Sequence, residues 1–206
     1  LIKNLETNLP WDHNLDNIAW ILWVCDLLNI DLKIFKKTIN HFEWLNHRLK
    51  NIWVHNWITF IDDAISTTPE STVKWIEAFK WKVDTIFLWW TDRGYHFEWL
   101  VKSLKENNIK NIVLFPESWL KIKKLLDDNF NILETSLMKD AVYFAFNYTK
   151  KGKICLLSTA SPSYFLWKNF EEKWDLFLKE INNYMTKEWL FTKKNKQIKI
   201  LEQQLI

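Results

Sequence analysis

Carboxylate, hydroxyl and basic side chains directly follow several short apolar runs of this 206-residue chain. The first such segment, Asp62 to Ser71, follows the run that ends at Ile61 and combines two adjacent carboxylates with several hydroxyl groups. Its carboxylates are suited to a ribose hydroxyl or a magnesium ion, and its hydroxyls to an anion at a helix N-terminus. The alternative is a plain capping turn in which Pro69 is the first residue of a helix.

Two further segments of this kind follow later apolar runs. Residues 89–94 read Trp-Trp-Thr-Asp-Arg-Gly, and Arg93 can reach a carboxylate or a phosphate from this loop. Residues 158–163 are rich in hydroxyl groups and lead, through residues 168–172, into a helix. Because ligands of parallel sheets bind outside the carboxyl ends of the strands, these loops predict one anion-binding crevice.

A fourth group of polar residues lies near the start of the chain. His13, Asn14 and Asn17 fall on one helical turn, and His47-Arg48 ends the same segment. Asparagine carboxamides can pair with the edge of an adenine, and Arg48 can reach phosphates, although Asn and His also cap helices routinely. The chain has no Gly-x-x-x-x-Gly-Lys-Ser/Thr sequence, so it contains no phosphate loop of that type.

Strand-like and helix-like patterns alternate over most of the chain, which predicts an α/β fold. We expect a Rossmann-like, mostly parallel sheet with helices on both faces, preceded by a helical remnant of another domain. The predicted strands are 58–61, 85–88, 111–115 and 154–158. The predicted helices are 14–28 and 32–42 in the remnant, followed by 70–79, 98–106, 120–126, 138–148 and 169–184.

The change of pattern near residues 45–50 predicts the domain organisation. We expect residues 1–48 to end one domain, residues 49–185 to form the Rossmann-like domain, and residues 186–206 to form a charged helical or disordered tail. Since the chain opens at Leu1 inside an expected strand, we expect it to be the C-terminal part of a longer protein.

Composition narrows the class of protein. A formal net charge of +3 is too small to indicate a nucleic acid partner. Cys25 and Cys155 lie in apolar stretches without a Cys-x-x-Cys partner, which favours reduced, buried thiols and a cytoplasmic location. The longest apolar stretch, residues 18–28, is short and is interrupted by Asp26, so we expect neither secretion nor membrane insertion.

The chain has 15 tryptophans and only 2 glycines. A chain of this length ordinarily has about 7% glycine, and several tryptophans stand in turn contexts that glycine normally fills. We interpret many of them as UGA codons of an organism that reads UGA as glycine; the alternative is a genuinely tryptophan-rich protein. The probable glycines are Trp11, Trp44, Trp57, Trp89, Trp90 and Trp174. The assignment is left open at Trp20, Trp23, Trp167 and Trp189.

Between about Leu9 and Tyr184 the chain resembles the C-terminal portion of the Mur ligases, and most closely those that add D-glutamate. The tryptophans repeatedly fall on glycines of the family motifs. The motifs are 11–17 (family Gly-x-His-Asn-x-x-Asn), 44–48 (Gly-Leu-x-His-Arg), 62–69 (Asp-Asp-Ala-Ile-Ser-Thr-Thr-Pro here), 89–94 and 168–174 (Lys-Asn-Phe-Glu-x-Arg-Gly).

The resemblance implies an ATP-dependent ligase that adds D-glutamate to UDP-N-acetylmuramoyl-L-alanine in cytoplasmic peptidoglycan synthesis. ATP and Mg²⁺ would be bound mainly by an upstream part that holds the phosphate loop and the metal ligands, so this segment alone would be inactive. The family roles carried over are Asn14 and Asn17 at the adenine, Arg48 and Asp63 at the phosphates and ribose, and Thr67, Arg93, Ser163 and Phe170 at D-glutamate.

Two departures from the family pattern bear on these roles. Ile65 replaces a usual lysine, so any charge at that position must come from elsewhere, and Arg93 stands where a lysine is usual. Two alternatives stay open. One is a related ligase, either another Mur ligase or one like folylpolyglutamate synthase. The other is a non-enzymatic module that binds single-stranded nucleic acid through exposed tryptophans and the lysines of residues 193–199.

Overall fold

The computed structural model describes residues 12–42, 50–55, 57–89, 94–116, 118–162 and 166–204. The chain divides into two compact units, residues 1–46 and residues 47–206. The first unit contains helices α1 (Asp12–Leu27) and α2 (Leu32–His41). The carboxylate of Asp31 caps α2 by accepting a hydrogen bond of 2.8 Å from the backbone N–H of Lys33.

Helices α1 and α2 share a small core. Ile18 of α1 and Phe35 and Ile39 of α2 are buried there, with Leu22 and Cys25 packed against them. Apolar side chains nevertheless occur on several sides of α1, as is typical of a helix enclosed in a larger domain. The exposed ones are Trp20, Ile21, Trp23, Val24 and Leu27. Helix α1 begins at Asp12, two residues before the predicted start, so His13 and Asn14 lie inside its first turn.

A six-stranded sheet forms the centre of the second unit, in the order β1-β2-β6-β3-β4-β5. The edge strand β1 pairs antiparallel with β2, and the other described pairs are parallel, which confirms the predicted α/β fold with a mostly parallel sheet. The strands are β1 (Lys50–His55), β2 (Ile58–Asp62), β3 (Val83–Leu88), β4 (Asn111–Leu114), β5 (Asn131–Glu134) and β6 (Ile154–Leu157).

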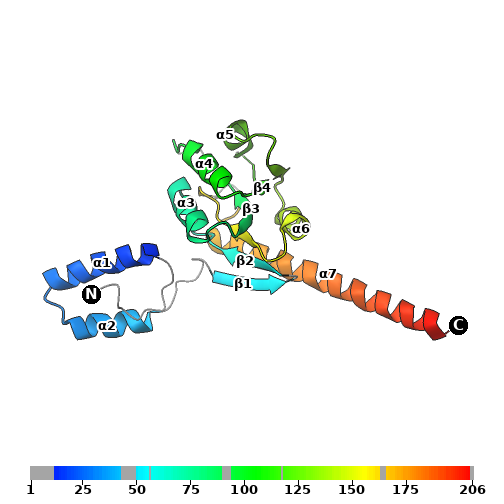
Figure 1. Cartoon of the computed structure of the whole chain (residues 1–206), viewed down its shortest axis with the longest axis horizontal. Coiled ribbons are helices and arrows are strands. Elements are labelled where there is room, and N and C mark those ends of the chain that lie inside the picture. The colour runs from blue at the N-terminus through cyan, green and yellow to red at the C-terminus, as the bar shows by residue number, and fades with distance from the viewer. Residues whose placement is uncertain are drawn as a thin grey trace. The chain divides into compact units, whose positions relative to one another are not determined.

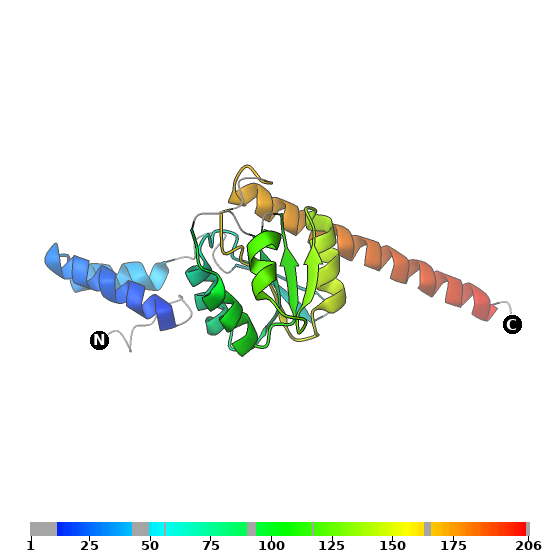
Figure 2. The same ribbon diagram turned by 90° about the horizontal axis from the view of Figure 1, so that it is seen from above.

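Helices cover both faces of this sheet. Helices α3 (Pro69–Ala78) and α4 (Glu98–Glu106) pack beside each other on one face, with α5 (Ser118–Leu125) next to α4. Helices α6 (Met138–Tyr148) and α7 (Phe170–Gln204) pack together on the other face (Figures 1 and 2). Helix α7 continues well past the predicted end at residue 184 and extends away from the sheet.

The largest described core lies between the sheet and helices α6 and α7. Phe60 of β2 and Phe87 of β3 point into it, and their rings lie 6.1 Å and 5.5 Å from the ring of Phe177 on α7. Every residue of β3, β4 and β6 is buried, as expected of central strands with both faces covered. The core therefore holds the carboxyl ends of these strands in fixed positions.

The sequence prediction missed two strands, and both are at the edges of the sheet. Strand β5 is only four residues long and is half-exposed, so it lacks the buried apolar run that marks the central strands. Strand β1 contacts the sheet through one partner only. Edge strands carry a weaker apolar signal because they bury less surface.

Two tryptophans have a left-handed backbone, which favours glycine. Trp57, with a φ of 68°, lies in the two-residue connection between His55 and Ile58, where Asn-Gly is the preferred sequence. Trp81, with a φ of 60°, follows Lys80, which is also left-handed and holds the position directly after the C-cap of α3 that glycine commonly takes. The glycine interpretation is thus supported at Trp57 and extends to Trp81, which was not among the predicted positions.

The other predicted glycine positions give no such signal. Trp89 is fully buried against Phe115 and Trp167, and Trp174 lies within α7, and neither has a positive φ. Trp11, Trp44 and Trp90 lie outside the described residues. No helix in the described ranges combines the length and apolar character needed to cross a membrane.

Candidate functional site

The described parts of the three predicted loops meet at one edge of the sheet. They follow β2, β6 and β3, which are neighbours in that order. The backbone N–H of Asp63 donates to the carbonyl of Leu157, and that of Trp89 donates to the carbonyl of Thr159, both at 2.9 Å. The segment after β6 therefore joins the other two, as expected where parallel strands end side by side.

The two carboxylates after β2 have different environments. Asp62 is buried, and its Oδ1 accepts a hydrogen bond of 2.8 Å from the backbone N–H of Ala64, which shapes the turn. Asp63 is also buried, and its Oδ2 accepts a hydrogen bond of 2.7 Å from the hydroxyl of Ser158. Its other oxygen, Oδ1, is buried and accepts no hydrogen bond from any described residue. Asp63 thus retains an unused acceptor.

Burial is the main influence on the Asp63 carboxyl group and raises its pKa from 3.8 to about 7. The neighbouring hydroxyls of Ser66 and Ser158 and the charge of Lys173 oppose this rise in the pKa, while the charge of Asp62 adds to it. Asp63 can therefore gain or lose a proton near neutral pH. Groups with this property are concentrated at functional sites.

Some polar residues before α3 cap the helix, and others do not take part in the cap. Thr68 is the N-cap, accepts a hydrogen bond of 3.2 Å from the backbone N–H of Ser71, and precedes Pro69. The capping alternative is therefore correct for this part of the segment. The cap uses neither Asp63 nor Thr67.

Asp63 and Thr67, which were predicted to bind ATP and D-glutamate, line one small pocket of about 200 Å³. The exposed Thr67 and the N-terminal turn of α3 supply hydroxyl groups to it, and Asp63 supplies the carboxylate. Hydroxyls can donate to an anionic group, and a carboxylate can accept from a hydroxyl or ammonium group. The lining residues are Asp63, Ile65, Ser66, Thr67, Thr68, Ser71 and Trp75.

Helix α7 begins beside this edge of the sheet with two capping contacts that resemble a capping box. Asn169 accepts a hydrogen bond of 2.9 Å from the backbone N–H of Glu172, whose carboxylate accepts one of 2.6 Å from the backbone N–H of Lys168. Phe170, a predicted D-glutamate residue, is half-buried and packs against the core between the sheet and the helices. The motif that includes Phe170 thus fixes where α7 starts.

Lys173 was not predicted as a site residue, yet it is 1% exposed at this edge. Its Nζ donates to the Oγ1 of Thr159 at 3.0 Å. Burial lowers the pKa of Lys173 to about 7, against the opposing attraction of Asp62 and Asp63. Its spacing of four and eight residues from the buried Phe177 and Ile181 was the available signal, because it places all three on one helix face.

The loop after β6 contains an unusual backbone conformation beside this lysine. Ala160 follows Thr159 with a φ of 58°, in the left-handed region that costs a residue with a side chain about 1 kcal/mol or more. Such conformations persist where surrounding contacts hold them, and they cluster at functional sites. The hydroxyl contacts of Thr159 are contacts of this kind.

The remaining predicted site residues are not placed relative to this pocket, because they lie in the first unit or outside the described residues. Asn17 is exposed on α1 in the first unit, and Asn14 lies one turn earlier on the same helix, but its side chain is not described. Arg48, Arg93 and Ser163 lie outside the described residues. Their predicted roles therefore stay predictions.

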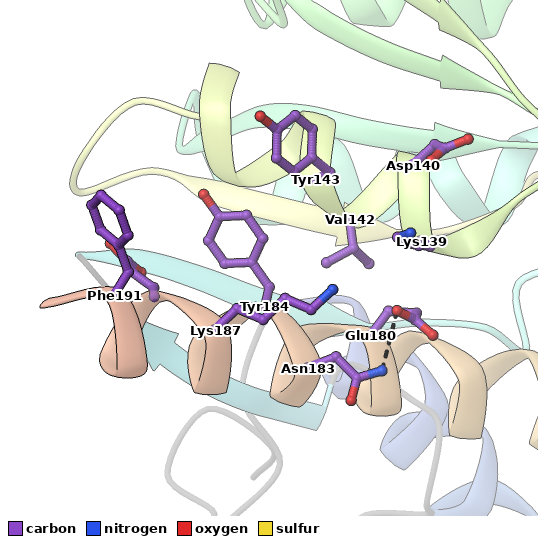
Figure 3. A pocket seen from close by; sticks show the side chains of 10 residues that line it. Lys139, Asp140, Val142, Tyr143, Glu180, Asn183, Tyr184, Lys187 and Phe191 are labelled. Carbon is purple, nitrogen blue, oxygen red and sulfur yellow. Dashed lines mark hydrogen bonds between the residues drawn. The ribbon is translucent and has the colours of Figure 1, made fainter. Parts of the chain in front are cut away.

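A hollow larger than this pocket lies elsewhere, between α6 and α7. It measures about 760 Å³ and contains none of the predicted site residues (Figure 3). Tyr143 of α6 and Tyr184 of α7 lie side by side there with ring centres 5.9 Å apart. Partial burial, with the Glu188 charge, raises the pKa of Tyr184. Across the described residues, no group of three or more His, Cys, Asp or Glu side chains is placed to hold a metal ion.

No family model matches the chain. Individual proteins do match it. The UDP-N-acetylmuramoylalanine–D-glutamate ligase of Streptococcus gordonii is 31% identical over 179 residues, which are 86% of this chain and 39% of that protein. The ligase of the same name from Caldanaerobacter subterraneus subsp. tengcongensis is 28% identical over 185 residues, 88% of this chain and 41% of that protein.

This chain is a homologue of the Mur ligases. It spans about two fifths of the length of the curated relatives that it matches. The resemblance noted in the sequence is therefore confirmed over most of the chain.

Solved Mur ligase structures share the fold. A MurF ligase from Thermotoga maritima, solved in complex with ADP, superposes with a TM-score of 0.59 at 17% identity over 84% of this chain and 40% of its own. An Acinetobacter baumannii UDP-N-acetylmuramoylalanyl-D-glutamyl-2,6-diaminopimelate–D-alanyl-D-alanyl ligase gives 0.63 at 15% identity, over 85% of this chain and 38% of its own. At these identities the match supports the fold alone.

Proposed function

We propose that this chain is the C-terminal part of an ATP-dependent ligase that adds D-glutamate to UDP-N-acetylmuramoyl-L-alanine in the cytoplasm. The observation that carries the proposal is the pocket shared by Asp63 and Thr67 at the carboxyl edge of the sheet. Relatives named for this reaction match the chain at about 30% identity. The ligase activity, its substrates and its nucleotide are all part of the proposal.

The reaction requires ATP because a free carboxylate has no good leaving group. Transfer of the terminal phosphoryl group of ATP converts the L-alanine carboxylate into an acyl phosphate. The amino group of D-glutamate then attacks the carbonyl carbon, the C–N bond forms, and the C–O bond to phosphate breaks with release of inorganic phosphate and a proton. Magnesium would neutralise the phosphate charge during phosphoryl transfer.

The described residues suit two parts of this task. The unused Oδ1 of Asp63 is an acceptor for a ribose hydroxyl, which fits its proposed place at the nucleotide. Thr67, on the wall of the same pocket, supplies a hydroxyl for D-glutamate. In the proposal Asn14 and Asn17 contact the adenine, Arg48 the phosphates, and Arg93, Ser163 and Phe170 the amino acid. A dicarboxylate ligand needs such a convergence of cationic and hydroxyl donors.

A chimera tests the proposed function. The upstream part of the Streptococcus gordonii ligase would be joined to this chain, and phosphate release would be measured with ATP, Mg²⁺ and UDP-N-acetylmuramoyl-L-alanine. We expect release that depends on D-glutamate and not on L-glutamate. Release with L-glutamate or another amino acid instead would indicate a related ligase of different specificity.

The isolated chain provides a second test that needs no catalysis. Amide NMR signals of Thr67 and Phe170 should shift on addition of D-glutamate and stay unchanged with L-glutamate at the same concentration. A matched variant, Thr67→Val, keeps the shape of the side chain and removes its hydroxyl, and we expect it to weaken D-glutamate binding about tenfold. Equal binding of both enantiomers would contradict the proposal.

A further inference from the structure

The burial of Lys173 is not explained by the helix that carries it. Lys173 is the fourth residue of α7, where the helix dipole disfavours a positive charge, and it is 1% exposed. Lysine is almost never fully buried unless its ammonium group has partners. The groups around Lys173 must therefore offset the cost of its burial.

One partner is Thr159, the second residue after β6. Lysine has only donors, so the 3.0 Å contact from Nζ makes the Oγ1 of Thr159 the acceptor. The hydroxyl proton of Thr159 is then directed to the carbonyl of Ser66 at 3.2 Å or of Ser161 at 3.1 Å. Lys173 thereby orients a hydroxyl that joins the loop after β6 to the loop after β2.

The neighbouring residue, Ser158, makes the matching contact with the opposite charge. Its hydroxyl donates to Oδ2 of Asp63 at 2.7 Å, which leaves the Thr72 hydroxyl to donate to Ser158 at 2.9 Å. Among the described residues, the charged groups that influence Asp63 are Asp62 on its own loop and Lys173 on α7. Consecutive residues after β6 therefore contact the ammonium group and a carboxylate of one buried cluster.

We propose that Lys173 is a positioning residue that orients the loops after β2 and β6 and favours the charged form of the Asp63 carboxyl group at the wall of the pocket. Removal of Lys173 would take away the attraction of its ammonium group for the buried carboxylates of Asp62 and Asp63, so that their burial and repulsion would favour protonation of Asp63. The consequence for ligand binding rests on the proposed function, whereas the contacts themselves do not.

Three variants of the 206-residue chain test this proposal. Lys173→Met keeps the length of the side chain and removes its charge, and Lys173→Arg keeps the charge. Lys74→Met is the control, because Lys74 is a 64% exposed lysine paired with Glu77 on α3. Two quantities would be measured by NMR: the titration midpoint of the Asp63 carboxyl carbon, assigned with Asp63→Asn, and the hydrogen exchange rate of the Ser66 amide.

We expect Lys173→Met to raise the Asp63 midpoint, because the carboxylate loses the attraction of the Lys173 charge. The Ser66 amide, which donates to the Asp63 carbonyl at 3.0 Å, should exchange about tenfold faster. Lys173→Arg and the Lys74 control should stay near the wild type. An unchanged midpoint in a folded Lys173→Met variant would overturn the proposal and leave Lys173 a packing role only.

The wild-type chain decides the question if Lys173→Met does not fold. With ¹³C-labelled lysine and aspartate, Lys173 and Asp63 should titrate over one shared pH range, and independent titration at ordinary values would overturn the proposal. Binding of D-glutamate separates the two proposals. If the wild type binds it, Lys173→Met should bind at least tenfold more weakly and Lys173→Arg should restore binding. Absence of binding to the wild type would contradict the proposed function and leave the titration result intact.

Discussion

At the scale of single residues, Trp57 and Trp81 hold a backbone conformation that their side chains disfavour. Asparagine takes the same left-handed conformation at Asn29 and Asn108, where its short polar side chain tolerates it. An indole has no such tolerance, and both tryptophans are largely exposed, so they gain little from packing. The residue type and the backbone conformation therefore conflict at these two positions.

Replacement by glycine should relieve this conflict. We expect Trp57→Gly and Trp81→Gly each to raise the free energy of unfolding of the chain by about 1 kcal/mol, measured by urea denaturation. The control is Trp99→Gly, because Trp99 is an exposed helical residue of α4. It should lower the free energy of unfolding by about 0.5 kcal/mol. A loss of stability in both turn variants would show that their tryptophans fit the fold.

The codons and the native protein test the glycine interpretation directly. We expect UGA codons at positions 57 and 81, and mass spectrometry of peptides from the source organism should find glycine there. Positions 89 and 174 show whether reassignment extends to residues whose backbone does not require glycine. UGG codons at all four positions would establish a genuinely tryptophan-rich chain.

Asp63 predicts a pH dependence of stability. Because its pKa is raised in the folded chain from 3.8 to about 7, mainly by burial, the folded state holds the proton more tightly than the unfolded state. Its contribution to the free energy of unfolding is therefore fully present below about pH 4 and is lost as the pH rises to about 7. The shift at Lys173 acts above that range.

The Asp63→Asn variant isolates this contribution. Compared with the wild type, it should lack the decrease in the free energy of unfolding between about pH 4 and about pH 7, a difference of at most about 4 kcal/mol. Urea denaturation at several pH values measures it. Parallel curves for the two proteins would contradict a raised pKa at Asp63.

At the scale of elements, the site depends on the position of β6 between β2 and β3. Helix α6 returns the chain across one face of the sheet so that β6 pairs with both strands. The hydroxyls of Ser158 and Thr159 then reach the loop after β2, and the backbone of Thr159 reaches Trp89. This single insertion brings together residues that are almost one hundred positions apart in the sequence.

The two helices of the first unit lead to another prediction. Their described core consists of three buried residues, and several apolar side chains of α1 are exposed. So small a core cannot offset the conformational entropy lost on folding. A peptide of residues 1–46 should therefore show little helix by circular dichroism in water. A cooperative thermal transition of that peptide would contradict this expectation.

At the scale of the whole molecule, the chain consists of two compact units that differ in size and in secondary structure. The larger unit has a complete sheet with both faces covered, and the smaller has two helices only. The division after residue 46 lies close to the predicted domain boundary at residue 48. The proposal that residues 1–48 belong to a separate domain can be tested independently. Separate expression of the larger unit supplies one.

Residues 47–206 should fold alone. We expect their melting temperature to match that of the larger unit in the 206-residue chain, since the sheet and helices α3 to α7 all lie within this range. Differential scanning calorimetry of both proteins makes the comparison, with residues 58–206, which lack β1 and keep β2, as the destabilised control. A large loss of stability on removal of residues 1–46 would show that the two units fold together.

The sequence by itself determined the class of fold and the segments that form the site. Central strands are recognised in the sequence as short, mostly apolar runs, and the polar residues that follow them mark the edge at which ligands bind. Such signals are local, so the segment from Asp62 to Ser71 could be named in advance, whereas the choice of Asp63 and Thr67 within it came from the resemblance to the Mur ligases. The prediction missed the edge strands β1 and β5 because their exposed sides carry fewer apolar residues, which weakens the apolar run that marks a strand.

Only the tertiary structure decided how these segments combine. The order of the strands placed the Ser158 and Thr159 hydroxyls beside Asp63, and the packing of α7 buried Lys173 at the same place. Burial changes the pKa of a group through its loss of contact with water, and that loss depends on neighbours supplied by distant parts of the chain. The backbone angles at Trp57 and Trp81 likewise come from the turns that their flanking elements impose.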